Sequence, residues 1–270
     1  MSNSSRIHLR SVLYISHGGG PLPLLGEPSH KEMIAGLKNI IIHMTKPSAI
    51  IVISAHWEED KATITSGANP ALLYDYSGFP QESYEIEYPA PGDPSLARKI
   101  FDVLKKKGIV ADLVEERGFD HGVFVPLKIM YPEADIPCLQ LSLVNTLSPA
   151  EHIRIGKAIA GLTEDNLLIV GSGFSFHNLK AFFSPSTDAI QSMNESFEQW
   201  LIDTCSSHEL SEKEREYRLV HWESAPAARF CHPREEHLLP LHVCYGVVQA
   251  PASQVFSWLV MGKQVSAYLW

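Results

Sequence analysis

The sequence lacks the basic surface that nucleic-acid binding requires. Lysine and arginine together number 22, against 31 aspartate and glutamate residues, and the formal net charge is −9. The longest basic cluster is the three lysines at positions 105–107, at the end of a predicted helix. Because proteins neutralise phosphate charge with clustered lysine and arginine, we expect no nucleic-acid partner.

Long apolar runs are also missing. No hydrophobic stretch reaches the roughly 18 to 20 residues that cross a bilayer, and the first residues lack the pattern of a secretory signal. We therefore expect no membrane partner and a cytoplasmic protein. Only four cysteines are present, with no C-x-x-C pair, which excludes a disulfide framework and indicates unpaired thiols.

What is present is the composition of an ordinary globular protein. Hydrophobic residues make up 45% and charged residues 20% of the 270 positions, and glycine and proline are spread along the chain. A chain of this length can bury about three quarters of its unfolded surface in one core. We predict a single domain over residues 1–270, with residues 1–8 flexible.

The hydrophobic pattern predicts an α/β fold. Continuous runs of branched apolar residues indicate buried parallel strands at 11–16, 49–54, 137–143 and 166–171. Capping residues and apolar stripes predict helices at 93–107, 148–162 and 188–205. Strands that alternate with helices imply a central, mainly parallel sheet covered by helices on both faces. A hairpin of strands 254–261 and 265–270, around a turn at 262–264, is expected at the sheet edge.

Histidine is unusually frequent, with thirteen residues, and three of them follow predicted strands. His17 follows the first strand, His56 the second and His177 the fourth. Ligand sites in open α/β sheets form at the carboxyl ends of the strands, so we expect these side chains to converge. Imidazole is the commonest protein ligand of transition metals, which makes a metal site the leading hypothesis.

Three glycines, at positions 18–20, follow His17 directly. They permit a sharp turn and leave room for a ligand beside the imidazole. The chain has no G-x-G-x-x-G and no GK[ST], so a nucleotide-binding loop is not expected.

A third metal ligand is expected from the segment REEHLLPLH, at the start of a predicted helix. An Fe(II) site that activates oxygen needs three protein donors on one face, with the opposite positions free. His17 and His56 satisfy this together with either His237 or Glu236. Glu236 would complete a set of two histidines and one carboxylate, whereas His237 would give an all-nitrogen set. The spacing leaves both alternatives open.

His121 lies in GFDHGVFVPL, which we interpret as a loop between glycines followed by an apolar run. A histidine in this setting could bind a substrate oxygen or transfer a proton. The alternative is a structural histidine whose ring is satisfied by hydrogen bonds.

Taken in order, these motifs resemble those of a known enzyme family. The chain is similar to the class III extradiol ring-cleavage dioxygenases (LigB-like), and among them to the single-chain 4,5-DOPA-type enzymes. The matching segments are SHGGGPLPLL, VISAHWEE, DYSGFPQESYEIEYPAPGDP, GFDHGVFVPLKIMYPEADIPCLQLSL, GSGFSFHNL and REEHLLPLH.

This resemblance implies an enzyme that opens a catechol ring with O₂. It implies that His17, His56 and His237 hold Fe(II), with Zn(II) as the alternative metal. It also implies that His177 acts as an acid/base or as a fourth ligand, and that His121 contacts the substrate.

The substrate is then a small aromatic diol. Family analogy suggests a catechol with an amino-acid or carboxylate side chain, for which Arg229 or Arg234 could provide bidentate hydrogen bonds. An oligomer is compatible with the sequence. Two other functions stay open, a zinc-dependent hydrolase and a non-enzymatic binding protein that keeps the same pocket. Oxygen uptake and metal content distinguish the three.

Overall fold

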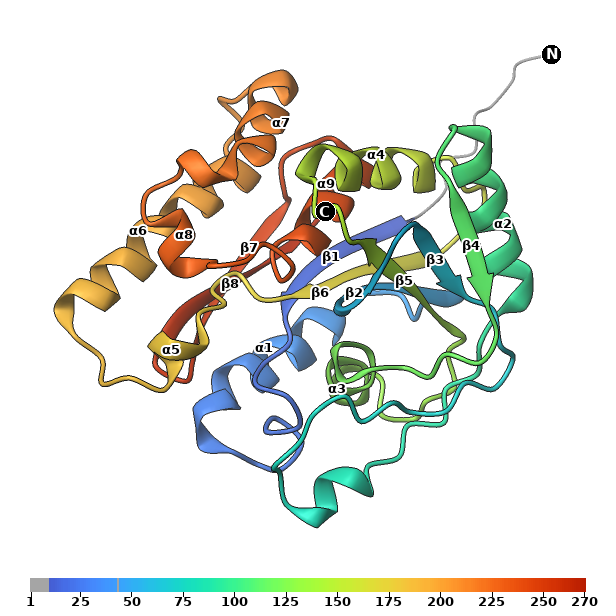
Figure 1. Ribbon diagram of the computed structural model, residues 1–270, viewed down its shortest axis with the longest axis horizontal. Helices are drawn as coiled ribbons and strands as arrows, with labels where there is room; N and C mark the ends of the chain where they lie inside the picture. The colour runs from blue at the N-terminus through green and yellow to red at the C-terminus, as the bar shows by residue number, and fades with distance from the viewer. Residues whose placement is uncertain (1–9, 43) are drawn as a thin grey trace.

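The computed structural model describes residues 10–42 and 44–270, so the expected flexibility of residues 1–8 lies outside the described residues. The described strands form an eight-stranded sheet in the order β4-β3-β5-β2-β6-β1-β8-β7 (Figure 1). The strands are β1 (Arg10–Ser16), β2 (Ala49–Glu59), β3 (Ala62–Thr65), β4 (Ala111–Val114), β5 (Cys138–Val144), β6 (Leu167–Gly173), β7 (Gln254–Val260) and β8 (Lys263–Leu269).

The centre of the sheet is parallel, as predicted. β1 pairs with β6, β6 with β2, and β2 with β5, all in parallel register. The four strands are almost entirely buried, which explains why they are continuous apolar runs in the sequence. Antiparallel pairs flank this centre, because β3 runs against β5, and β8 runs against both β1 and β7.

Helices cover the sheet on both faces. In Figure 1, α4 and α9 lie on one side of the central strands, and α1 and α3 lie on the other. The α-helices are α1 (Lys31–Ile42), α2 (Pro94–Lys106), α3 (His121–Met130), α4 (Pro149–Ile159), α5 (Leu179–Phe182), α6 (Asp188–Ser206), α7 (Glu212–Val220), α8 (Ala228–Cys231) and α9 (Leu239–Val248). Short 3₁₀ turns are η1 (Pro28–His30), η2 (Gln81–Tyr84) and η3 (Trp222–Ser224).

The structure confirms the predicted capping residues at the starts of two helices. The Asp93 side chain accepts a hydrogen bond from the Leu96 N–H at the start of α2, and Ser148 accepts one from Glu151 at the start of α4. Each helix has proline in its first turn, where the missing N–H has no helical partner to lose. These local signals place both helices within a few residues of their predicted bounds.

The C-terminal hairpin lies at the sheet edge, as predicted, but its turn is shorter than the predicted 262–264. Val260 pairs with Lys263, so only Met261 and Gly262 form the turn. Both have positive φ, 50° and 74°, which matches the twist of a two-residue hairpin loop.

Two features of the described residues bear on the expectations about membrane-spanning segments and unpaired thiols. None of the helices in residues 10–42 and 44–270 is long and apolar enough to cross a membrane. All four cysteines are buried and free.

Candidate metal centre

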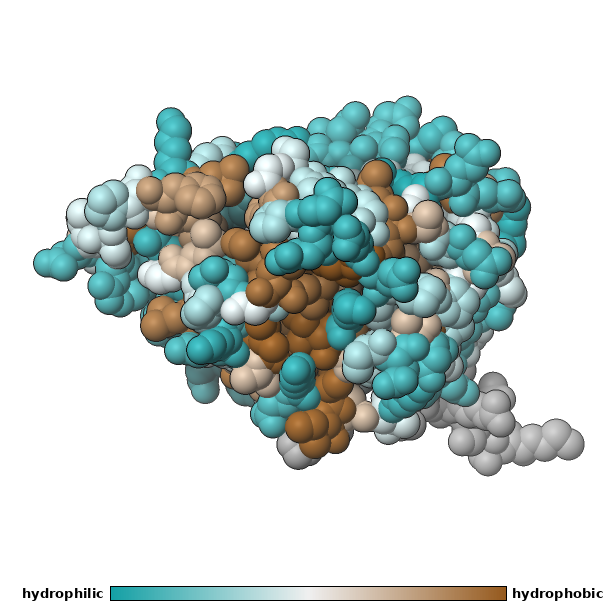
Figure 2. All heavy atoms as spheres, turned by 90° about the horizontal axis from the view of Figure 1, so that it is seen from below, coloured by the Kyte–Doolittle hydropathy of each residue, from teal (hydrophilic) through white to brown (hydrophobic). Residues whose placement is uncertain are grey.

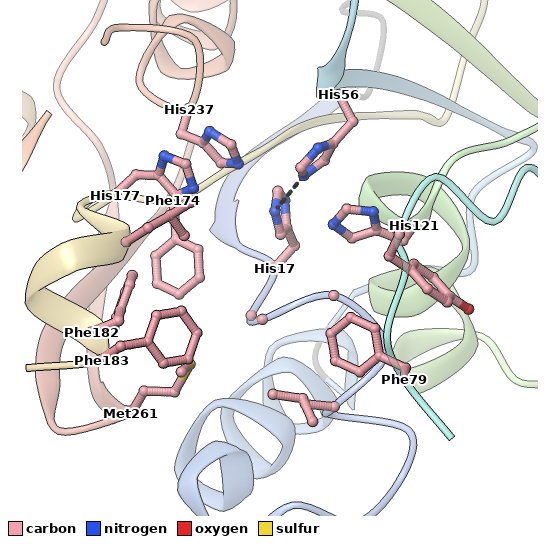
Figure 3. A pocket seen from close by; sticks show the side chains of 16 residues that line it. His17, His56, Phe79, His121, Phe174, His177, Phe182, Phe183, His237 and Met261 are labelled. Carbon is pink, nitrogen blue, oxygen red and sulfur yellow. Dashed lines mark hydrogen bonds between the residues drawn. The ribbon is translucent and has the colours of Figure 1, made fainter. Parts of the chain in front are cut away.

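Three imidazoles converge at the carboxyl end of the central strands. One ring nitrogen from each of His17, His56 and His237 lies within 4.8 Å of the others, and the Nε2 atoms of His17 and His56 are 3.1 Å apart. Figure 3 shows the three rings facing a common point, with the cavity in front of His17. The strand-end prediction therefore places His17 and His56 together.

The strand order explains how two of these rings meet. β1 and β2 are the two parallel neighbours of β6, so their carboxyl ends lie close together. His17 follows β1 directly, and its N–H donates to the Gly173 carbonyl at 3.0 Å. The prediction that His56 follows its strand was wrong. β2 continues to Glu59 through a register irregularity between Ile53 and Glu58, so His56 lies within the strand.

His237 comes from a turn that precedes α9, two residues before the helix begins. Its carbonyl accepts hydrogen bonds from the Phe174 N–H and the Tyr14 hydroxyl, both at 3.0 Å. Gly173 permits this close approach, because a Cβ at that position would lie 2.1 Å from the His237 oxygen. The absence of a side chain at Gly173 in β6 therefore allows the His237 imidazole to lie beside the other two.

Hydrogen bonds fix which ring nitrogen faces the common point. The Ser172 hydroxyl donates its one proton to the Gly122 carbonyl, so the His17 Nδ1–H donates to Ser172 Oγ at 3.0 Å. The His237 Nδ1–H donates to Glu236 Oε1 at 3.0 Å. In both rings Nε2 is left as the unprotonated nitrogen, which is the arrangement that outer partners impose on metal-binding histidines.

The three imidazoles are held neutral. Burial, together with the neighbouring imidazoles, lowers the pKa of His17 and His56 well below its ordinary value. Burial and His177 lower the pKa of His237 to about 3. Neutral imidazole is the form that binds metal ions, so the cluster is ready to act as a donor set without releasing protons first.

The geometry fits a divalent transition metal. Two nitrogens about 2.1 Å from one ion, at octahedral or tetrahedral angles, are roughly 3.0 to 3.4 Å apart. The 3.1 Å between His17 Nε2 and His56 Nε2 falls in this range. Three nitrogen donors on one side leave the side toward the cavity for other ligands.

Glu236 lies behind His237 and does not reach His17 or His56. Its carboxylate instead forms a group with His177 and His237, at 3.3 Å from His177 Nδ1. Burial disfavours the charged carboxylate, but the hydrogen bonds from His177 and His237 outweigh burial and lower the pKa of Glu236. Of the two alternatives, the structure brings His237 to the other imidazoles and places Glu236 as its hydrogen-bond acceptor.

His177 and His237 are stacked rings. Their centroids are 3.4 Å apart with 17° between the planes, and the His177 N–H donates to the Cys231 carbonyl at 2.9 Å. His177 also lines the cavity in front of the cluster. It therefore stands beside the three converging imidazoles, as expected for a residue that follows β6.

His121 is the first residue of α3, so the interpretation of its segment as a loop was wrong. Its ring lies 3.8 Å from His56 and 5.5 Å from His17, measured between centroids. Asp75 Oδ1 accepts hydrogen bonds from His121 Nδ1 at 2.8 Å and from the His121 N–H at 2.9 Å. Burial opposes the charge of Asp75, but the hydrogen bonds from His121 outweigh burial and lower its pKa.

Sequence reasoning did not identify Asp75. The one signal was its position at the start of the motif-bearing segment DYSGFPQESYEIEYPAPGDP, in a stretch without periodicity.

The cluster opens into a cavity of about 340 Å³ (Figure 3). This volume is in the range of small-molecule sites, which is roughly 300 to 1,000 Å³. Most of its walls are aromatic or aliphatic. The lining residues are His17, Gly18, Gly19, Gly20, Leu22, His56, Tyr76, Phe79, His121, Phe174, His177, Leu179, Phe182, Phe183, His237 and Met261.

Residues 11–264 match the family described as the catalytic LigB subunit of aromatic ring-opening dioxygenase. The chain belongs to this family. Dioxygenase tasH of Hapsidospora irregularis is 39% identical, over 99% of this chain and 87% of that protein. The 4,5-DOPA dioxygenase extradiol of Beta vulgaris is 35% identical, over 90% of this chain and 88% of the relative. An uncharacterized Escherichia coli K12 protein has the same fold, with a TM-score of 0.75, 26% identity, and coverage of 96% of this chain and 98% of that one.

This LigB-family protein is a metal-dependent extradiol dioxygenase, an enzyme that opens an aromatic ring beside a pair of hydroxyls. The family membership confirms the resemblance seen in the motifs. The relatives do not favour the zinc hydrolase or the non-enzymatic binding protein.

The two arginines suggested as carboxylate partners lie outside the cavity of the dioxygenase. Arg229 is half-exposed, pairs with Glu223 and Glu235, and stacks over the Trp222 ring at 4.7 Å. Arg234 donates to both carboxylate oxygens of Glu58, one of them at 2.6 Å. It lines a neighbouring groove instead.

Apart from His121 and His177, none of the other histidines in residues 10–42 and 44–270 lines the cavity or belongs to the three-imidazole cluster. His30, His152, His232 and His242 are buried, and each ring is hydrogen-bonded to backbone groups. His8 and His43 lie outside the described residues.

Proposed function

We propose that this chain is an Fe(II)-dependent extradiol dioxygenase that opens the ring of a catechol with O₂, and that residues 1–270 form one catalytic domain. The observation that carries the proposal is the meeting of three neutral imidazoles at the closed end of an aromatic-sized cavity. Family membership supplies the reaction class, and the cluster supplies the place for it.

His17, His56 and His237 would hold the metal through Nε2. Three histidines also suit Zn(II), so the donor set alone does not select the ion. The reaction selects it, because Zn(II) has no redox chemistry and reduction of O₂ needs a metal that exchanges electrons. When bound, Fe(II) lowers the pKa of the catechol hydroxyls and carries electron density from the ring to oxygen.

His177 is the proposed base. The carboxylate of Glu236 lies 3.3 Å from its Nδ1 and accepts from it, which leaves Nε2 as the nitrogen that can take a proton. From the cavity wall His177 would accept the proton of the second catechol hydroxyl and return it as the ring opens. General acid/base help of this kind is worth about 10² to 10⁴ in rate.

His121 is the proposed substrate contact. Asp75 accepts the proton on Nδ1, so Nε2 is the nitrogen available to a substrate oxygen. The second hydrogen bond from the His121 backbone N–H to the same carboxylate fixes the start of α3 relative to Asp75. The ring is therefore positioned before substrate arrives, as efficient catalysis requires.

Oxygen uptake tests the proposal. Protein loaded with Fe(II) under anaerobic conditions and then mixed with catechol in aerated buffer should consume one O₂ per ring opened. Zn(II)-loaded protein should consume none. The control variant His17→Ala should lose metal and oxygen uptake together, because two remaining donors cannot hold the ion against water. Full Fe(II) occupancy without oxygen uptake on any catechol would show the proposal to be wrong.

A further inference from the structure

The cavity has an apolar wall that faces the space in front of the three imidazoles. Phe174 and Phe182 pack against each other, with ring centroids 5.4 Å apart, and Phe183 and Leu179 extend the wall toward solvent. Met261, at the tip of the β7–β8 hairpin, closes it. Figure 3 shows Phe174, Phe182, Phe183 and Met261 on the side away from His121, whereas Phe79 lies on the side of His121.

Among residues 10–42 and 44–270, no lysine, arginine, aspartate or glutamate lines this cavity. Apart from the histidines, Tyr76 is the one ionisable side chain that the described part of the chain contributes to the lining, and the Tyr76 hydroxyl donates to the Ser83 carbonyl at 2.6 Å. Arg229 and Arg234 are paired with carboxylates elsewhere. A carboxylate on the ring substituent would therefore lose its hydration in the cavity without gaining a cationic partner, which is strongly unfavourable.

The mouth of the cavity is apolar too. Leu179 is 59% and Phe183 79% exposed, and both line the cavity. Figure 2, seen from below Figure 1, shows hydrophobic residues gathered in a band across the middle of that face. Exposed apolar side chains at the rim of a pocket gain free energy when a ligand covers them, and they favour a ligand with an apolar extension.

We infer that the substrate is a catechol whose ring substituent is an uncharged alkyl or aryl group, and not the amino-acid side chain of DOPA or a carboxylate. This inference rests on the proposed function and narrows it. It also differs from the family analogy, which suggested a charged side chain.

A neighbouring groove offers an alternative route for a charged substituent. His177 and Leu179 line both spaces, and Lys180 and Arg234 line the groove. A charged substituent that passed over His177 would meet these cations. The Arg234 guanidinium is already held by Glu58, so Lys180 is the residue to test.

A pair of substrates with the same shape and different charge provides the test. In 4-(3-methylbutyl)catechol an isopropyl end replaces the carboxylate of 3-(3,4-dihydroxyphenyl)propionate. With Fe(II)-loaded protein we expect kcat/KM for the alkylcatechol to be higher by about 100-fold, because the carboxylate is desolvated without a partner. Equal or reversed preference would overturn the inference and leave the proposed function intact. Failure to cleave either compound, or catechol itself, would instead contradict the proposed function.

Binding to metal-free protein gives a readout that does not depend on turnover. The corresponding monophenols, 4-(3-methylbutyl)phenol and 3-(4-hydroxyphenyl)propionate, cannot be cleaved as catechols. Calorimetry should detect tighter binding of the alkyl compound, and equal or tighter binding of the acid would overturn the inference.

Three variants test whether the substrate preference arises from the apolar wall. Phe183→Arg, at an exposed position, should raise relative kcat/KM for the carboxylate by up to about fivefold, the value of an exposed ion pair. The uncharged control Phe183→Leu should keep the alkyl preference. Lys180→Ala should leave the substrate ratio unchanged, and a selective loss of activity on the carboxylate would overturn the inference.

Discussion

Replacement of Gly173 by alanine should separate the third imidazole from the other two. The new Cβ would lie 2.1 Å from the His237 carbonyl oxygen, whereas ordinary contact begins at 3.4 Å. The turn that carries His237 must then retreat by roughly 1.3 Å, far more than the ±0.2 Å within which metal–ligand distances vary. We expect metal affinity to fall by at least 10- to 100-fold, the range seen when the outer support of a ligand is lost.

The same change should also destabilise the fold moderately. Overpacking costs about 1 to 3 kcal/mol, so the melting temperature of the metal-free protein should fall by several degrees. Titration with Co(II), followed by its visible absorption, measures the affinity.

Gly92→Ala is the matched control for stability. Its Cβ would lie 2.0 Å from the Gly67 carbonyl oxygen, and neither residue lines the cavity. It should lower the melting temperature without weakening the metal. Equal metal affinity in the two variants would refute the idea that Gly173 positions His237.

Three further changes have expected outcomes. His177→Ala should keep its metal, by elemental analysis, and lose about 10² to 10⁴ in kcat, measured as oxygen uptake. Asp75→Asn should lower kcat by less than this, and the kcat–pH profile should shift, because His121 loses the carboxylate that accepts from its Nδ1. Burial raises the pKa of Glu198 to about 7 from 4.5, so the folded protein keeps a proton that the unfolded chain releases. Its contribution to stability is full below pH 4.5 and falls by about 3 kcal/mol as the pH rises to 7. Glu198→Gln should remove this slope from melting temperatures measured between pH 4.5 and 8.

A different result in each of these variants would contradict the corresponding prediction. Loss of metal from the His177 variant would make that residue a ligand, and full activity would remove it from the mechanism. An unchanged pH profile in the Asp75 variant would reduce the carboxylate to a structural role. An unchanged slope in the Glu198 variant would mean that another group titrates in this range.

The central strands could be predicted because both faces of each are buried, so the sequence reads as an unbroken apolar run. The short strands β3 and β4 have only four residues each, too few for a recognisable pattern. Helix α3 was missed, and of α9 only the start was predicted, for a different reason. Nearly every residue of both is buried, so neither has the polar face that reveals a helix in a sequence.

The site residues also divide into those that the sequence could predict and those that it could not. His17 and His177 were predictable because strand ends in a parallel sheet are known to meet. The choice between Glu236 and His237 could not be made, since two adjacent residues in a turn point in different directions that only the tertiary contacts determine. Asp75 and the aromatic wall lie in segments without periodicity, and their place beside the imidazoles depends on long-range packing.

The three converging imidazoles come from distant parts of the chain, two near its beginning and one near its end. A nascent or truncated polypeptide that stops before His237 can offer at most two of them. With the proposed ligands, the complete donor set forms only after the segment that contains His237 has been synthesised and has packed against Phe174, which follows β6. An incomplete chain would then bind the metal more weakly than the full-length protein does.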